Sequence, residues 1–232
     1  MELGLATKLE NKERINKYKT LQESIKDGHL EETQELFAAR DKNLITAKQC
    51  DLLVFQLVDN LKKNASIDSL TKINNRALLG PQLAKVREEL NHEGGEKKYP
   101  VQSVMVIFLD VKDFKKLNDE HGHAVGDRAL IIVAERLKKS IKRNDSAFRV
   151  GGDEFIALLP INENNPQTCE AIFERIKNKI NADLSVNDGT QNIPFSISMG
   201  FEILNKGDDT TSEEVLEKAD KKMYVDKNKM LN

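Results

Sequence analysis

The sequence predicts an α+β fold: a central, mostly antiparallel sheet flanked by helices, with an all-helical segment before it. Three observations predict this fold. The run "SVMVIFLDV", residues 103–111, is apolar almost to its end, which is the pattern of a buried central strand. The runs "AFRV" and "EFIALLP" are short and strand-like, and Gly151 and Gly152 join them as in a hairpin. Amphipathic helical stretches lie between these strands.

The composition is that of a chain with one core and much exposed helix. Of its 232 residues, 32% are charged and 5% are aromatic. The net charge is −2 and no block of lysine or arginine stands out, so we expect no nucleic acid as partner. A small polyanion such as a nucleotide needs only a few local cations, so it stays possible. Cys50 and Cys169 are the only cysteines and lie far apart, which predicts reduced thiols in a cytoplasmic protein.

Residues 1–64 form the first of two predicted regions, and we expect them to be helical. They contain no proline and only two glycines, and Asp27 and Gly28 predict a break between two helices. The longest apolar patch, Leu52–Val58, is too short to span a bilayer, and no apolar signal core precedes it. The apolar stripe of the second helix is too wide for one exposed helix. Either a helical pair packs on its own domain, or the helices form a dimer that passes a signal forward, which we favour.

Residues 65–232 form the second predicted region. Turn and capping residues in "SIDSLTKINNRALL" lead into a helix that runs to about Asn91, and "NHEGGEKKYP" is a loop. "HAVGDRALIIVAERLKKSI" is an amphipathic helix, and "NPQTCEAIFERIKNKINADL" is a helix with Pro166 in its first turn. The alternating run "IPFSISMGFEIL" predicts one or two strands. The last helix opens with a capping box, Thr211 or Ser212 followed by glutamate.

Three acids form the first candidate site. Asp110 ends the buried strand, where a carboxylate is costly unless it is paired or bound to a cation. If this strand lies beside the hairpin, Asp110 meets Asp153 and Glu154. Such carboxylates with no nearby base form a site for a hard cation such as Mg²⁺, which in turn binds phosphate oxygens. A site of this kind suits two-metal chemistry. Glycine accepts a positive φ in the turn and lets a ligand approach the backbone. The simpler alternatives are a strand-end aspartate that caps a turn and an ordinary solvated hairpin.

Polar residues crowd what we expect to be a short loop after the strand at 103–111. An asparagine with an aspartate suits guanine, because the amide reads the carbonyl side and the carboxylate takes N1–H and N2–H₂. The His-Gly-His spacing has no third soft ligand beside it, so we assign these residues to turn packing and to the substrate edge. No GxxxxGK[ST] motif occurs, so a triphosphate would not be held by a P-loop. The loop residues are Lys115, Asn118, Asp119, His121, His123 and Asp127.

Taken together, these motifs resemble the GGDEF domains, the diguanylate cyclases. "RVGGDEF" matches the signature of that family. "DSLTKINNRALL" resembles its opening D-x-L-T-x-L-x-N-R segment, and "FLDVKDFKKLNDEHGHAVGDRAL" resembles its D-x-D-x-F-K-x-x-N-D-x-x-G-H-x-x-G-D-x-x-L segment. "SISMGFEI" and "ADKKMYVDK" resemble its late strand and final helix. The resemblance covers roughly residues 65–232.

The resemblance implies a fold related to the nucleotidyl cyclases and the polymerase palm. It implies a reaction that joins two GTP molecules into cyclic di-GMP and releases two pyrophosphates. Each protomer would hold one GTP, so two half-sites must face each other in a homodimer. This requirement is why we favour dimerisation for the N-terminal helices.

The resemblance also implies roles for individual residues. Asp110 and the carbonyl of Val111 would bind metal, and Asp153 and Glu154 would complete a site for two Mg²⁺ or Mn²⁺ ions per half-site. Asp153 or Glu154 would help to deprotonate the 3′-hydroxyl. The other implied roles are backbone approach to the phosphates at Gly151 and Gly152, guanine recognition by Asn118 and Asp127 with His123 in the same pocket, and neutralisation of phosphate charge by Lys115 and Lys227.

Three departures from the family pattern matter. Lys112 stands where the family often has the second acid of D-x-D, and we expect activity to survive this change. The final helix usually runs Y-x-A-K-x-x-G-R, but "YVDKNKML" places Met230 and Leu231 where Gly and Arg would be, so a phosphate contact is lost unless Lys229 replaces it. The inhibitory product site, R-x-x-D, has Lys142 at the arginine position and keeps Asp145. Lysine cannot form arginine's bidentate fork, so we expect weak product inhibition.

Three functions compete on this sequence. The leading one is an active diguanylate cyclase. The second is a catalytically inactive GGDEF module that binds GTP or cyclic di-GMP and regulates a partner, but inactive members usually have a broken signature and this one is intact. The third is a structural dimerisation protein, which would leave the intact set of acids without a purpose.

Overall fold

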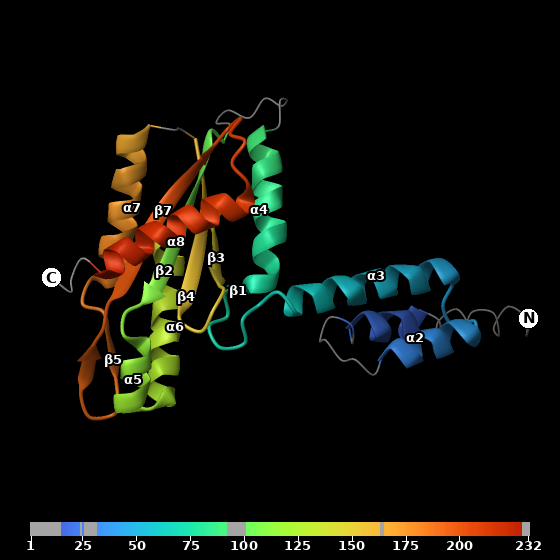
Figure 1. Cartoon of the computed structure of the whole chain (residues 1–232). Coiled ribbons are helices and arrows are strands. Elements are labelled where there is room, and N and C mark those ends of the chain that lie inside the picture. Colours follow the sequence, from blue (N-terminus) through green and yellow to red (C-terminus); the bar gives the residue numbers. More distant parts are fainter. Residues whose placement is uncertain (1–14, 24, 26–31, 92–100, 163–164, 229–232) are drawn as a thin grey trace, which may run out of the picture. The chain divides into compact units, whose positions relative to one another are not determined.

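The structure is a computed structural model of the chain, and it describes residues 15–23, 25, 32–91, 101–162 and 165–228. The chain divides into two compact units, Met1–Ala65 and Ser66–Asn232, and each is considered by itself (Figure 1). The predicted break at Asp27 and Gly28 and the predicted loop over 92–100 lie outside the described residues.

Where the structure describes it, the first unit is mainly helical, as predicted. It contains a helical segment at 15–23, α2 (Glu32–Asp41) and α3 (Ala47–Asn64). A reciprocal capping box starts α3: the Gln49 N–H donates to Thr46 Oγ1 at 3.2 Å, and the Thr46 N–H donates to Gln49 Oε1 at 2.9 Å.

Helix α3 has two apolar faces. Cys50, Leu53 and Leu57 on one face are buried with side chains of α2 and the first segment. On the other face Leu52 is 47% exposed and Phe55 is 70% exposed within this unit. The width of the apolar stripe therefore has two origins, because one part builds the unit's own core and the other part faces outward.

The second unit is built on a five-stranded sheet with the order β1-β3-β4-β2-β7. Its strands are β1 (Asn74–Asn75), β2 (Ser103–Val111), β3 (Ser146–Arg149), β4 (Glu154–Ile161) and β7 (Ile197–Asn205). β1 runs parallel to β3, and the other neighbours are antiparallel. The predicted mostly antiparallel sheet with a buried central strand is confirmed, because β2 lies between β4 and β7.

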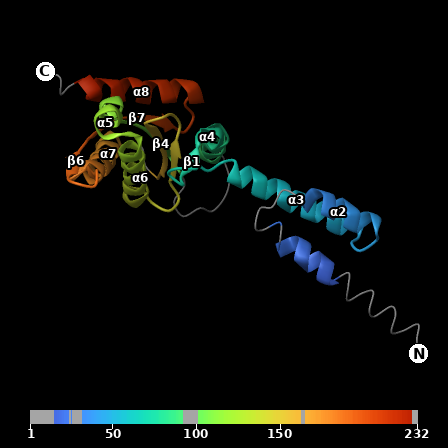
Figure 2. The ribbon, with the colours of Figure 1, turned by 90° about the horizontal axis from the view of Figure 1, so that it is seen from below.

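Helices cover both faces of this sheet (Figure 2). The helices are α4 (Arg76–Asn91), α5 (Phe114–His121), α6 (His123–Ser140), α7 (Pro166–Asn181) and α8 (Ser212–Asn228), and a separate hairpin joins β5 (Ser185–Asn187) to β6 (Asn192–Pro194). Successive side chains of β2 point to opposite faces of the sheet, so each of the two helical layers contacts every second residue. Val104 and Val106 pack with α4 and α8, whereas Met105 and Ile107 pack with α6 and α7. This pattern explains why β2 reads as continuously apolar.

The predicted helix starts are confirmed. Asn165 caps α7 by accepting hydrogen bonds from the backbone, and Pro166 follows in the first turn. Thr211, rather than Ser212, forms the capping box of α8: its N–H donates to Glu214 Oε2 at 2.8 Å, and the Glu214 N–H donates to Thr211 Oγ1 at 3.2 Å. Helix α8 is therefore fixed at its start before it crosses the sheet.

The expected short loop after β2 is wrong, because two helices occupy it. Asp113, in the left-handed region at φ 52°, turns the chain from β2 into α5. Gly122, at φ 85°, separates α5 from α6. A left-handed φ suits glycine, so Gly122 lets two helices meet at a sharp corner. The polar residues of this segment therefore lie on helices.

Two further expectations concern thiols and membranes. Cys50 and Cys169 are both buried, and no disulfide joins them, as predicted. Over the described residues, none of the helices has the length and apolarity to cross a membrane.

Candidate active site

The acids of the signature meet at one end of the sheet. Asp110 on β2 pairs in register with Glu154 on β4 and with Ser198 on β7. Directly opposite residues of antiparallel strands carry their side chains on the same face. Asp110 has the same parity as Val104 and Val106, so this polar row lies on the face that α8 covers. The sheet therefore brings together Asp110 and the signature acids, as the sequence predicted.

Lys227 of α8 contacts this row. Its Nζ lies 2.6 Å from Asp110 Oδ1, and Asp110 is only 6% exposed. The hydrogen bond to Asp110 raises the pKa of Lys227, and the charge of Asp153 adds to this effect. A buried carboxylate needs a cation, and in the free protein the Lys227 ammonium provides it.

The Gly-Gly turn joins β3 to β4 as predicted, but not by the predicted backbone conformation. Neither Gly151 nor Gly152 has a positive φ. A Cβ on Gly151 would lie 2.3 Å from Glu154 Oε2, so this glycine makes room for the Glu154 side chain. A Cβ on Gly152 would meet no atom within 4 Å, which leaves its backbone open to a ligand. The Val111 N–H donates to the Asp153 carbonyl at 3.2 Å and ties the turn to β2.

Arg149 holds this turn, a role that no pattern in the sequence predicted. Its guanidinium donates to the Gly152 carbonyl at 2.8 Å and to Asp68 Oδ1 at 3.2 Å. Asp68 in turn accepts from the Thr71 hydroxyl at 2.6 Å. The opening motif and the signature are therefore joined by one ion pair, which fixes the backbone around the glycines. The only sequence signal for Arg149 was its place as the first residue of the RVGGDEF match.

The remaining acids repel one another. Burial, followed by the charge of Asp110, raises the pKa of Asp153. Burial, followed by the charges of Asp153 and Asp110, raises the pKa of Glu154. Among the described residues, no three His, Cys, Asp or Glu side chains already form a metal-binding cluster. The crowded oxygen ligands nevertheless fit a divalent cation such as Mg²⁺, which would relieve this repulsion.

The predicted guanine-recognition residues lie on two helices that meet at Gly122. Asn118 is on α5 and Asp127 on α6. Asn118 Oδ1 is buried without a hydrogen-bond partner among the described residues, and a Cβ on Gly126 would lie only 1.9 Å from it. A buried amide oxygen without a donor is costly, and here it lies against Gly126.

Three further residues of this segment fall into two groups. Lys115 on α5 and His123 at the start of α6 are exposed. His121 points elsewhere: its Nδ1 lies 3.6 Å from Asp188 Oδ2 on the β5–β6 turn. The His-Gly-His spacing is thus divided between a structural contact and an exposed side chain.

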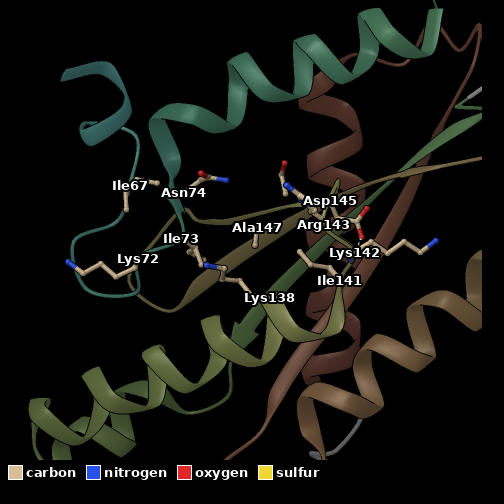
Figure 3. A pocket seen from close by; sticks show the side chains of 11 residues that line it. Ile67, Lys72, Ile73, Asn74, Lys138, Ile141, Lys142, Arg143, Asp145 and Ala147 are labelled. Carbon is tan, nitrogen blue, oxygen red and sulfur yellow. Dashed lines mark hydrogen bonds between the residues drawn. The ribbon is translucent and has the colours of Figure 1, made fainter. Parts of the chain in front are cut away.

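Lys142 and Asp145 lie at the other end of β3 from the Gly-Gly turn. Asp145 Oδ2 accepts from the backbone N–H of Lys142 at 2.7 Å, and burial raises the Asp145 pKa. Both residues line a cavity of about 420 Å³ between α6, β3 and the opening turn. Figure 3 shows the Lys142 side chain extending away from Ile73 and Ala147 on the floor of this cavity. The departures at Lys229, Met230 and Leu231 lie outside the described residues.

Comparisons with known proteins agree with this geometry. The family described as "Diguanylate cyclase, GGDEF domain" matches residues 65–232. The chain is 30% identical to the probable diguanylate cyclase DgcJ of Escherichia coli over 75% of its own length and 32% of that protein. It thus spans about a third of this curated relative.

Two solved structures are similar as well. The GGDEF domain of TpbB from Pseudomonas aeruginosa has a TM-score of 0.59 and 31% identity, over 70% of this chain and 88% of that one. The diguanylate cyclase SiaD from the same species, solved in complex with its activator SiaC, has a TM-score of 0.63 and 25% identity, over 98% of this chain and 83% of that one. The fold, the acids at its strand ends and these matches show that the chain belongs to the GGDEF family of diguanylate cyclase domains.

Proposed function

We propose that this protein condenses two GTP molecules into cyclic di-GMP and releases two pyrophosphates at the interface of a homodimer. The observation that carries the proposal is the alignment of Glu154 and Asp110 in one row, with Lys227 above it. A triphosphate is negatively charged and needs cations around it. The acids can supply bound metal ions, and the lysine is itself a cation. A reaction that consumes GTP places the protein in the cytoplasm.

The metal site would be formed by Asp110, the Val111 carbonyl, Asp153 and Glu154. Two bound Mg²⁺ or Mn²⁺ ions would supply Lewis acidity at the phosphoryl centre. Glu154 or Asp153 takes the proton of the 3′-hydroxyl, because a carboxylate beside the reacting hydroxyl can act as a general base. The 3′-oxygen then forms a bond to the α-phosphorus of the facing GTP, and the bond from that phosphorus to pyrophosphate breaks.

Substrate binding uses residues on both sides of the acids. The backbone at Gly152 is open to the phosphates, while Lys115 and Lys227 neutralise their charge. Asn118 and Asp127 recognise guanine, with His123 at the edge of the same pocket. The Asn118 amide donates to the carbonyl side of the base, and the Asp127 carboxylate accepts from N1–H and N2–H₂.

Each protomer carries one set of these residues, so the reaction requires two copies that face each other. We propose that the N-terminal helices bring the copies together. The outward face of α3, with Leu52, Phe55 and Val58 each more than 40% exposed, is the surface for this contact. A self-complementary apolar face is what a two-fold dimer buries.

A second candidate is a GGDEF module that binds nucleotide and regulates a partner, or an enzyme that awaits an activator. The pairing of Asp110 with Lys227 favours it, because this ion pair competes with a metal ion for the carboxylate. SiaD, which is similar to this chain over both units, is described with an activator. An activator protein is therefore part of this alternative.

The test is turnover of GTP with Mg²⁺ by the purified protein, with products identified by mass. Glu154→Gln is the matched control, because it keeps the size of the side chain and removes its charge. Cyclic di-GMP from the wild type alone supports the cyclase proposal. No product from the wild type at a protein concentration where dimers form would overturn it in favour of the second candidate.

A further inference from the structure

Asp226, the residue before Lys227, joins the end of α8 to two other elements. Lys177 Nζ of α7 lies 2.6 Å from Asp226 Oδ1. The backbone N–H of Met199 on β7 donates to Asp226 Oδ2 at 3.0 Å. One carboxylate therefore ties a helix, a neighbouring helix and a strand together within one residue of the lysine that contacts Asp110.

The edge position of β7 explains why Met199 can bond to a side chain. β7 is the last strand of the sheet, with β2 as its neighbour. The outward backbone groups of an edge strand have no strand to pair with. Asp226 supplies an acceptor to one of them, so α8 is anchored to the sheet backbone. An anchor to backbone is more rigid than a contact between two flexible side chains.

A second contact holds α8 one turn earlier. A Cβ on Gly200 would lie 2.1 Å from the backbone nitrogen of Met223, so the helix lies directly on β7 at this point. Met223 and Lys227 are one helical turn apart and share a face. The close approach at Gly200 thus fixes the distance of α8 from β7, and the anchor at Asp226 fixes the helical turn that carries Lys227.

The charges around Asp226 favour its ionised form. Burial opposes ionisation, but the hydrogen bonds from Lys177 and from the Met199 N–H hold the pKa of Asp226 below its usual value. The positive charge of Lys112 acts in the same direction. The carboxylate therefore remains a charged acceptor for both of its partners, and hydrogen bonds to a charged group are the stronger kind.

We propose that Asp226 is a positioning residue that holds the Lys227 ammonium over Asp110, where the phosphates of the substrate bind. This inference rests on the proposed function for the phosphate role of Lys227. The geometric part, that Asp226 fixes Lys227 against Asp110, does not depend on it.

The first experiment measures binding of α,β-methylene GTP with Mg²⁺, an analogue that cannot release pyrophosphate, to the full chain by calorimetry. We expect Asp226→Ala to weaken binding about tenfold, the size of a lost charged hydrogen bond. Asp226→Asn keeps an acceptor for Met199 and should fall between. In a Lys227→Ala background, Asp226→Ala should have no further effect, because Asp226 acts through Lys227.

The matched control is Glu202→Ala. Glu202 Oε2 lies 2.9 Å from Lys222 Nζ, so this ion pair also joins β7 to α8, but away from Lys227. An ion pair with one exposed partner, Lys222, contributes little, so binding should change by less than about twofold. A control that weakens binding as much as Asp226→Ala would overturn the proposal, since general loosening of α8 would then suffice. Equal effects of Asp226→Ala with and without Lys227 would overturn it too.

The second experiment needs no nucleotide. Unfolding free energies of wild type, Asp226→Ala, Lys227→Ala and the double variant form a cycle in the free protein. We expect the two effects to be non-additive, because the Lys227–Asp110 contact depends on Asp226. Additive effects would refute the positioning role whatever the ligand. If the wild type fails to bind the analogue, the proposed function fails, and this cycle still decides the role of Asp226.

Discussion

Replacing Gly200 with alanine tests how closely α8 lies on the sheet. The added Cβ would lie 2.1 Å from the backbone nitrogen of Met223 and 2.6 Å from the Ala219 carbonyl oxygen. Ordinary carbon contacts begin near 3.4 Å, so the helix must withdraw by about 1.3 Å. Overpacking of this kind costs about 1–3 kcal/mol. In a chain of this size each kcal/mol lowers the Tm by about 2–4 °C, so we expect a decrease of about 2–12 °C.

Thermal melting followed by circular dichroism measures this effect. Gly152→Ala and Gly80→Ala are matched controls, because an added Cβ at either position meets no atom within 4 Å and neither φ is positive. Gly152→Ala should melt within about 1 °C of wild type, as expected of a surface change. Gly80 lies inside α4, where alanine should stabilise by about 0.5–1 kcal/mol. A Gly200→Ala variant that melts at the wild-type temperature refutes the close approach of α8.

Three further predictions concern the site. Glu154→Gln should abolish product formation and raise the Tm of the free protein by about 1–2 °C at pH 8, because it removes one of several repelling charges. Because folding raises the pKa of Glu154, the ionised carboxylate destabilises the folded protein at a pH above that pKa. The gain in Tm should therefore vanish as the pH falls below 4.5, the usual pKa of a glutamate. Arg149→Met should lower turnover about tenfold, because it frees the Gly152 carbonyl. Lys142→Arg should strengthen inhibition by cyclic di-GMP about tenfold in a product titration, because arginine restores the bidentate fork.

Each of these predictions has a result that contradicts it. A Glu154→Gln variant that melts below wild type at pH 8 would show that repulsion between the acids does not destabilise the folded protein. Unchanged turnover in Arg149→Met would show that the turn needs no anchor. Strong inhibition of the wild type by cyclic di-GMP, with the site at Lys142 and Asp145 occupied, would refute the expected weak product inhibition.

The sequence by itself determined most of the second unit's fold. A continuous apolar run such as 103–111 can be satisfied only between two layers, so β2 had to be central. The capping box at Thr211 and the proline at Pro166 mark helix starts by local hydrogen bonding alone. The strand-end position of Asp110 and the signature predicted that Asp110 lies beside the signature acids, and the register of β2 with β4 pairs it with Glu154.

Only the tertiary structure decided how those residues are held. The glycine at Gly151 is required by the Glu154 side chain rather than by a positive φ, which no local pattern distinguishes. Arg149 reaches back to Asp68, and Asp226 reaches the edge of β7 and Lys177, across long distances in the sequence. Lysine, arginine and aspartate are common at the exposed ends of helices and strands, so neither composition nor periodicity distinguishes Arg149 or Asp226 from the others. Their roles arise from partners that folding brings close, and the sequence contains no local signal for such contacts.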